Sequence, residues 1–234
     1  MNKYDKLVKK KPDVKEDIAR RICKAARYYK KHLVGKTFLV CFAGTKVEVR
    51  FKTENFAHLC GVQTHLLAED FFRLACHRRL TGKMFYFDKQ HNRANVENKL
   101  AHLTKMEDVL LGGPVVCKQV ETRTKVHDIG LNCEVDGAHL LICFNRVKNS
   151  PGSALVPCSF RIEELPEERC LFKLKASLVF VKDTDERLYT DCIYGEVPDR
   201  SSLSKKVQRK LGESVRLMPH NSRELETEEE IEKE

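Results

Sequence analysis

The first third of the chain switches from a helical hydrophobic period to strand-like runs. In residues 13–33 apolar side chains recur every three or four positions, which predicts an amphipathic helix. Its apolar positions are Val14, Ile18, Ile22, Ala25, Tyr29 and Leu33. Asp13 and Glu16 have the spacing of a helix capping box. The runs 36–43 and 46–52 then predict a β-hairpin across a Gly-Thr turn.

The following segments predict three more helical stretches. Residues 53–62 fit a loop or short helix that ends at Gly61. Residues 64–80 and 95–110 each show apolar positions in helical step, and Gly112-Gly113-Pro114 ends the second of these helices.

From residue 115 onward the pattern changes to short strands. We expect them at 115–120, 125–135, 138–145, 156–162, 170–181 and 187–194. Asp136-Gly137 predicts a type I′ hairpin turn between two of them. A short basic helix is expected at 202–212. Helices followed by a meander of strands indicate an α+β fold rather than a wound parallel sheet.

The domain division follows from the same patterns. One domain over residues 13–212 is the economical choice, with a basic N-terminal tail at 1–12 and an acidic, disordered tail at 213–234. No apolar run approaches the roughly 18–20 residues that a membrane-spanning helix needs, and residues 1–17 lack the apolar core of a secretory signal. We therefore expect a soluble protein that does not contact membranes.

The charge of the chain is positive and uneven. The formal net charge is +9, and the predicted first helix is rich in lysine and arginine. A solvated cationic helix and a phosphate-binding face both fit this pattern. The glutamates near the C-terminus could shield a basic face until nucleic acid displaces them, or could serve only to solubilise the chain.

The ten cysteines are spread evenly and include no C-x-x-C pair. Several lie within apolar runs, so reduced, buried thiols are expected, and reduced thiols indicate the cytosol. Zinc ligand pairs or a disulfide framework are the alternatives.

Motif analysis removes several enzyme classes. The sequence contains no phosphate-binding loop, no G-x-G-x-x-G, no G-x-S-x-G and no H-E-x-x-H motif. What remains is an inventory of His, Lys, Arg, Tyr and Ser. These side chains suit RNA cleavage by the ribose 2′-hydroxyl, which needs a base, an acid and cations around the phosphorane. No metal or other cofactor is expected.

One segment carries a family resemblance. FKTENFAHLCG (51–61) resembles the F-x-x-x-N-F-x-H-L-T-G motif of a phage-associated branch of the barnase–EndoU–colicin–RelE-like (BECR) nuclease superfamily. Further similarity follows in Phe71-Phe72-Arg73, Lys99-Leu100, Val156-Pro157-Cys158-Ser159 and a Lys-rich strand leading to Tyr189, over roughly residues 35–200. Cys60 stands where the pattern has Thr, which would remove a hydroxyl beside His58.

The resemblance implies a ribonuclease of toxin type. Its expected fold has N-terminal helices packed on a small twisted antiparallel sheet, with RNA across the concave sheet face. Its expected partners are RNA and an antitoxin or immunity protein.

The candidate catalytic residues are His58, Lys99, Ser159 and Tyr189. An imidazole can act as acid or base near neutral pH, so His58 is the first choice for that role. Lys99 could stabilise the phosphorane, Ser159 could hydrogen-bond phosphate, and Tyr189 could stack on a base or donate to phosphate. A loop histidine, a solvated lysine, a polar strand face and a core tyrosine are the respective structural alternatives.

The candidate substrate-binding residues are Arg73, His102, Arg161, Lys173 and Lys175. Arg73 could grip a phosphate with two hydrogen bonds. His102 shares a helix face with Lys99, and Arg161 shares a strand face with Ser159. Ordinary surface charge is the alternative for each of them.

Three functions remain open on the sequence alone. The first is a metal-independent endoribonuclease of toxin type. The second is a non-catalytic RNA- or protein-binding module of phage or mobile-element origin. The third is a structural or regulatory phage protein that binds no nucleic acid.

Overall fold

The computed structural model describes residues 13–89, 91–123, 125–147, 154–196 and 199–218. The basic tail predicted at 1–12 lies outside the described residues. The same is true of the part of the acidic tail beyond residue 218.

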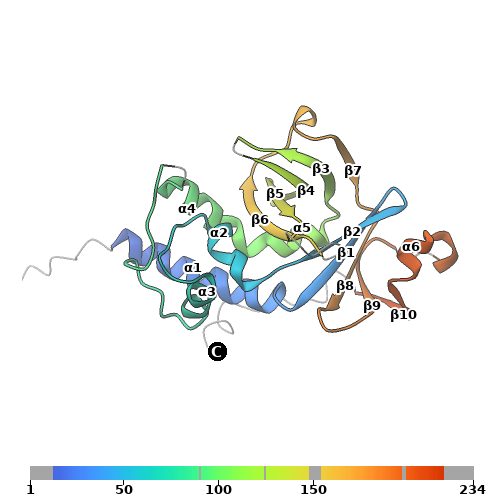
Figure 1. Cartoon of the computed structure of the whole chain (residues 1–234), viewed down its shortest axis with the longest axis horizontal. Helices are drawn as coiled ribbons and strands as arrows, with labels where there is room; N and C mark the ends of the chain where they lie inside the picture. Colours follow the sequence, from blue (N-terminus) through green and yellow to red (C-terminus); the bar gives the residue numbers. More distant parts are fainter. Residues whose placement is uncertain (1–12, 90, 124, 148–153, 197–198, 219–234) are drawn as a thin grey trace, which may run out of the picture.

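Helix α1 (Val14–His32) forms where the helical period predicts it. The Asp13 side chain caps it by accepting a hydrogen bond from the backbone N–H of Lys15 at 2.9 Å. Its buried face consists of Ile18, Ala19, Ile22, Cys23, Ala25, Ala26 and Tyr29. The helix lies along the base of the molecule, where α3 packs against it (Figure 1).

Within the described residues the strands form two five-stranded sheets. The first sheet has the order β10-β9-β8-β1-β2, and the second has the order β6-β5-β4-β3-β7. Strands β1 (Lys36–Phe42), β2 (Thr45–Arg50), β8 (Leu178–Asp183), β9 (Tyr189–Tyr194) and β10 (Leu211–Leu217) make the first. Strands β3 (Val115–Glu121), β4 (Val126–Val135), β5 (Ala138–Asn145), β6 (Val156–Ile162) and β7 (Phe172–Lys175) make the second.

The α+β class is confirmed, but the expected small sheet under N-terminal helices is wrong. Two sheets of five strands are present, and helix α6 (Lys205–Gln208) lies near the C-terminal end of the described chain. Ladder pairing is antiparallel except between β9 and β10, which run parallel.

A single strand predicted at 170–181 is in fact two strands. Strand β7 pairs with β3 in the second sheet, whereas β8 pairs with β1 in the first. Ala176 and Ser177 carry the chain from one sheet to the other, and their backbone N–H groups bond to Pro114 and Cys41. Hydrophobic periodicity does not report such a crossing, because both halves keep their strand pattern.

The helix predicted at 95–110 is also interrupted. It consists of α4 (Arg93–His102), a 3₁₀ turn η2 (Leu103–Lys105) and α5 (Met106–Leu111). Lys105, with φ −108° and ψ 8°, leaves the helical region and redirects the chain. Leu103 at the start of the turn and Met106 directly after it stay buried, so the apolar period continues through the break.

Short helices connect the first sheet to α4. They are the 3₁₀ turn η1 (Thr53–Asn55), α2 (Phe56–Cys60) and α3 (Ala68–Cys76). Two further 3₁₀ turns, η3 (Glu167–Arg169) and η4 (Arg200–Ser202), lie elsewhere in the chain. α2 contacts β6 of the second sheet and also α4. The segment 53–61 is therefore held between the helices and one edge of the second sheet.

The main hydrophobic core lies between α1, the other helices and the inner faces of both sheets. Aromatic side chains of several elements meet in it, with Tyr29, Phe51 and Phe56 in tilted or edge contacts. A second cluster packs α6 onto the opposite face of the first sheet, and a third lines the opposite face of the second sheet.

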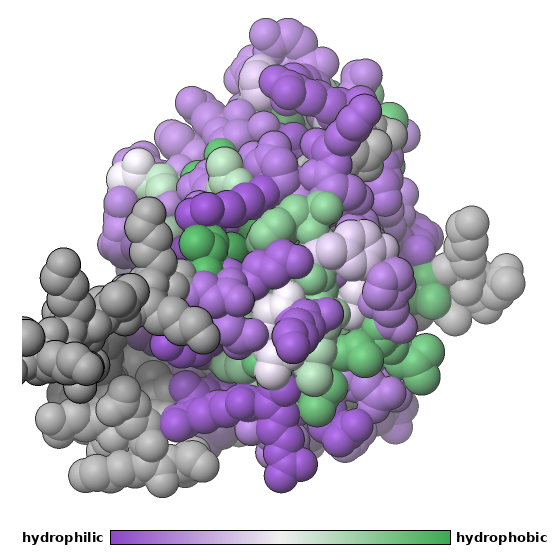
Figure 2. Space-filling view, turned by 90° about the vertical axis from the view of Figure 1, so that its left-hand side faces the viewer, coloured by the Kyte–Doolittle hydropathy of each residue, from purple (hydrophilic) through white to green (hydrophobic). Residues whose placement is uncertain are grey.

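The surface of the helical end is largely hydrophilic. Figure 2 shows it as predominantly polar, with a smaller apolar group near its centre. Among the described residues, no helix is both long and apolar enough to cross a membrane. All ten cysteines are free thiols, and six of them are buried.

The Gly113 turn before β3 gives a test of the packing between the helices and the first sheet. Gly113 has φ +72°, and a Cβ at this position would overlap the Tyr194 ring. Gly137 has φ +74° with open space around it, so it reports the backbone strain alone. We expect Gly137→Ala to lower the free energy of unfolding by about 1–2 kcal/mol. Gly113→Ala should cost about 1–3 kcal/mol more because of the clash. Chemical denaturation measures both, and equal losses would contradict the described packing.

Candidate active site

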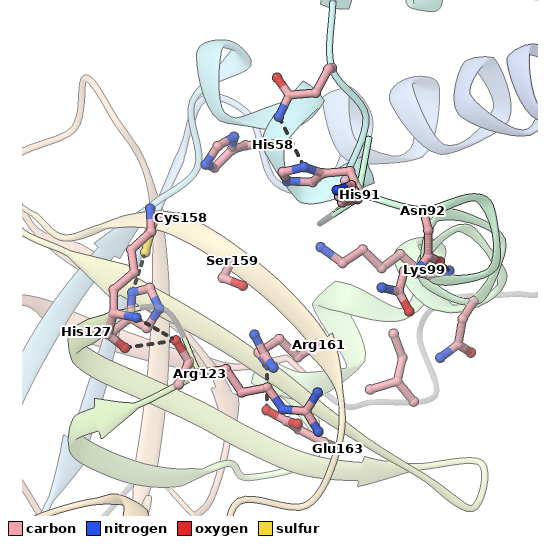
Figure 3. Close-up of a pocket in the computed structure, with 18 residues that line it drawn as sticks. His58, His91, Asn92, Lys99, Arg123, His127, Cys158, Ser159, Arg161 and Glu163 are labelled. Atoms are coloured by element: carbon pink, nitrogen blue, oxygen red, sulfur yellow. Dashed lines mark hydrogen bonds and ion pairs between the residues drawn. The ribbon is translucent and has the colours of Figure 1, made fainter. Parts of the chain in front are cut away.

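A polar cavity of about 750 Å³ opens between α4, the end of α2 and the edge of the second sheet. Figure 3 shows side chains from these elements directed into it. It is lined by His58, Gly61, Gln63, Lys89, His91, Asn92, Asn95, Asn98, Lys99, Thr122, Arg123, Lys125, His127, Cys158, Ser159, Arg161, Ile162 and Glu163. Segments that are far apart in the sequence therefore meet here.

The motif helix α2 presents His58 to this cavity. Phe56, Leu59 and Cys60 are fully buried, so the one-turn helix is anchored by its apolar side while His58 stays exposed. The motif pattern, which has Thr at position 60, predicts a hydroxyl beside His58. The structure instead buries Cys60 in the core, and a hydroxyl there would not face the cavity.

Gly61 ends α2 in a left-handed conformation, with φ +74°. The Lys99 side chain of α4 passes directly over it. A Cβ on residue 61 would lie 3.1 Å from Lys99 Cδ and 3.2 Å from Nζ. The glycine is thus needed twice, for its backbone angle and for the space that Lys99 occupies.

Lys99 is largely enclosed at the wall of the cavity. Desolvation by burial lowers the pKa of its amine, the buried Cys60 opposes this effect, and the positive charge of Arg161 adds to it. In Figure 3 the Lys99 amine points towards Ser159 and the histidines. A partly desolvated ammonium in this position interacts strongly with an anion.

Strand β6 is the edge strand that supplies Ser159 and Arg161. The register of β6 against β5 shifts between Cys143 and Phe144, as at a β-bulge. Cys158 faces the cavity together with both predicted residues. Arg161 Nε donates to Glu163 Oε1 at 2.5 Å, which holds the guanidinium in place.

His58 has an environment that favours the neutral imidazole. Partial desolvation is the largest cause that lowers its pKa, and the nearby cation Lys125 is the second. His91 and Lys99 act in the same direction. A lowered pKa leaves His58 unprotonated, and so able to accept a proton, at neutral pH.

A second histidine of the cavity, His91, was missed by the sequence analysis. Its Nδ1 lies 3.0 Å from Asp88 Oδ1 and 3.1 Å from Gln63 Nε2. The His91 backbone N–H also donates to Asp88 Oδ1, at 2.6 Å. The only signal in the sequence is the Asp-x-x-His spacing in a loop without hydrophobic periodicity.

His127 and Cys158 form a further pair in the cavity wall. Cys158 Sγ lies 3.1 Å from His127 Nδ1 and 3.2 Å from the Cys143 carbonyl oxygen. Burial raises the pKa of the Cys158 thiol to about 11 and lowers the pKa of His127. Both groups are therefore neutral near pH 7, and the pair braces the wall rather than supplying a thiolate.

The electrostatic character of the cavity is strongly positive. Its charged lining comprises five cations and one carboxylate: Lys89, Lys99, Arg123, Lys125, Arg161 and Glu163. The single carboxylate is already paired with Arg161. Such a lining favours a polyanionic ligand.

Four of the nine predicted site residues meet in this cavity: His58, Lys99, Ser159 and Arg161. The other five do not line it. Tyr189 is fully buried in the cluster under α6, where burial and the Glu48 carboxylate raise the pKa of its hydroxyl. It therefore cannot stack on a base in this structure.

The remaining predicted residues lie elsewhere for identifiable reasons. Arg73 is exposed on α3 and pairs with Asp70 at 2.8 Å. Nδ1 of His102 is enclosed at the end of α4, outside the cavity lining. Lys173 and Lys175 lie on β7, and β7 and β6 form opposite edges of the second sheet.

No three His, Cys, Asp or Glu side chains converge as a metal-binding group anywhere in the part of the chain that the structure describes. The ligands offered by the cavity are instead cations, amides and imidazoles.

An α+β fold with a cationic, histidine-bearing cavity at a sheet edge defines a protein suited to phosphodiester substrates. The family model described as "phage-Barnase-EndoU-ColicinE5/D-RelE like nuclease4" matches residues 21–196, and the chain belongs to this family of BECR-type nucleases. The predicted membership is thereby confirmed. Neither the curated proteins nor the solved structures contain a significant match to the chain.

The electrostatics of His58 can be tested without any assay of activity. We expect its pKa to lie below the usual 6.5 in the intact protein. Lys125→Gln removes a nearby positive charge, so the pKa should rise towards that value. Lys118→Gln is the matched control, because Lys118 is an exposed lysine outside the cavity lining. NMR titration of the imidazole resonances measures the pKa of His58 in the unsubstituted protein and in both variants. A fall in this pKa on Lys125→Gln would overturn the described environment.

Proposed function

We propose that the protein is a ribonuclease that cleaves RNA by attack of the ribose 2′-hydroxyl on the adjacent phosphate. The observation that carries this proposal is the meeting of two histidines, a desolvated lysine and a tethered arginine around one open cavity. Membership of a nuclease family supports it. RNA is proposed over DNA because a mechanism without an activated water needs the 2′-hydroxyl as its nucleophile.

His58 is the general base of the proposed reaction. The effects that lower its pKa keep the imidazole neutral at pH 7, so it can accept the 2′-hydroxyl proton. As this proton leaves, the 2′ oxygen bonds to phosphorus and a pentacoordinate phosphorane develops.

His91 is the proposed general acid. The Asp88 carboxylate accepts the Nδ1–H and orients the ring, which leaves Nε2 as the nitrogen available to the substrate. A proton from Nε2 passes to the 5′ oxygen as its bond to phosphorus breaks. The products are a 2′,3′-cyclic phosphate and a free 5′-hydroxyl.

Lys99 and Arg161 are the proposed stabilisers of the phosphorane. Both cations are in position before substrate arrives, because the Lys99 side chain lies over Gly61 and Arg161 is paired with Glu163. The fixed charges therefore require little reorganisation as negative charge builds up. Ser159 of β6 lines the same cavity and would donate a hydrogen bond to a phosphate oxygen (Figure 3).

The wider assignment is a metal-independent toxin of the cytosol, with an antitoxin or immunity protein as its partner. The support is the family membership and the ten free thiols. Induced expression in a bacterial host, compared with the His58→Ala variant, tests the toxin assignment. Growth arrest by the unsubstituted protein alone is the expected result.

Cleavage of RNA in the presence of EDTA tests the catalytic proposal. His58→Ala should slow cleavage by about 10²–10⁴-fold because the base is lost. Lys99→Met should slow it by about 10²–10³-fold because a preorganised charge is lost. His77→Ala is the control, since His77 is exposed at the end of α3 and outside the cavity. Product ends are identified by their cyclic phosphate.

Three results would reject this mechanism. One is intact RNA with the unsubstituted protein, and another is equal activity of His58→Ala. The third is cleavage of a strand whose scissile nucleotide is 2′-deoxy. Salt-sensitive RNA binding without cleavage would favour the non-catalytic binding module instead.

Gly61→Ala tests whether the contact between the motif and Lys99 matters for catalysis. A methyl group there forces the Lys99 side chain to move by a few tenths of an ångström and strains a backbone angle of +74°. We expect kcat to fall roughly 10-fold or more, because a charge near the reacting phosphate is displaced. Gly35→Ala, with φ +82° and open space, is the matched control and should leave kcat unchanged. Equal kcat values for the two variants would show that the Lys99 contact has no catalytic effect.

A further inference from the structure

An aromatic pair lies beside the active-site cavity, on the two segments that precede and follow α3. The rings of His65 and Tyr86 stack with centroids 4.9 Å apart and an interplanar angle of 28°. Both residues are exposed, and Tyr86 retains 38% of its accessible surface. Tyr86 is thus stacked on His65 on one side while more than a third of the residue remains accessible to another planar group.

The pair adjoins the cavity through a short antiparallel bridge. The Gln63 backbone N–H donates to the Tyr86 carbonyl at 3.2 Å, and the Tyr86 N–H donates back at 2.9 Å. Side chains of directly opposed residues project from the same side of such a ladder. The neighbours Val62 and Phe85 are buried on the other side, so Gln63 and Tyr86 both face outward.

Gln63 connects this outward face to the proposed chemistry. Its side chain lines the cavity, and its Nε2 lies 3.1 Å from His91 Nδ1. Gln63 therefore contacts both Tyr86, through its backbone, and the proposed general acid His91, through its side chain. A strand of nucleic acid with a phosphate at His91 would carry its neighbouring nucleotides past Tyr86.

We propose that His65 and Tyr86 form a nucleobase-stacking subsite that selects single-stranded RNA. The proposal rests on the proposed function, because it assumes that a phosphate of the strand occupies the cavity. A base can lie on the exposed Tyr86 ring only when it has left its own helical stack. A duplex offers no such base, so the subsite favours loops and unpaired segments.

The stacking mode also fixes what the subsite can discriminate. Base–aromatic stacking contributes about 1–3 kcal/mol per base and tolerates every base, since each has a flat face. The subsite therefore recognises the unpaired state of a nucleotide rather than its identity. His65 contributes by holding the Tyr ring from behind.

The test compares Tyr86→Leu with Tyr86→Phe, which keeps a flat ring at the same place. On a single-stranded oligonucleotide, Tyr86→Leu should raise KM by about 5–150-fold, the equivalent of losing one stacked base. Tyr86→Phe should stay close to the unsubstituted protein. A dinucleotide has no base beyond those flanking the cleaved bond. On this substrate the KM of both variants should equal that of the unsubstituted protein.

A second measurement keeps the two proposals separate. The fluorescence of 2-aminopurine in an oligonucleotide is quenched when that base stacks on an aromatic ring. This quenching reports binding without any cleavage. Quenching that is lost in Tyr86→Leu and kept in Tyr86→Phe supports the subsite even if no RNA is cut, in which case only the proposed catalysis fails. Cleavage with equal KM for both variants, or equal quenching by both, overturns the subsite and leaves the catalytic proposal intact.

Discussion

The contact between the Lys99 side chain and Gly61 is the interaction on which the active-site arrangement depends. It joins the short motif helix to α4 across almost forty residues of sequence, and it encloses an amine beside a cavity that carries four other cations. The contact requires a residue without a side chain in a left-handed turn, so the glycine of the motif has a spatial reason. Because Phe56, Leu59 and Cys60 anchor the same turn in the core, the position of His58 is determined by packing that lies behind it.

Local patterns predicted the local structure well. α1, the β1–β2 hairpin and the turn at Asp136-Gly137, where both residues have positive φ, formed at the predicted places. The arrangement of strands was not predictable in the same way. Residues 170–181 look like one strand because each half buries an apolar face, but the two halves belong to different sheets. Which sheet a strand joins is decided by long-range packing, and no signal of that choice exists in a short window of sequence.

In the site, too, the residues that a local sequence pattern indicates were predicted, and those whose position depends on long-range packing were not. His58 followed from a motif, and Ser159 with Arg161 followed from strand alternation, so these residues were brought to one cavity as their spacing implied. His91 lies in a loop, where no period indicates which way a side chain points. Tyr189 lies away from the cavity, because it is buried by Val207 of α6 and Leu211 of β10, which follow it in the chain and are not indicated by the pattern of its own strand.

The positive cavity has a consequence for the order of events in the proposed reaction. In the free protein, desolvation and the surrounding cations hold the pKa of His58 down, so the base is unprotonated before RNA binds. A bound phosphate brings negative charge among these cations and offsets part of their effect. The imidazole then gains proton affinity at the moment when the 2′-hydroxyl is in reach. The cations of the cavity repel one another and so lower the stability of the free protein. When the phosphate binds, part of this repulsion is offset, and the resulting rise in the pKa of His58 favours proton transfer.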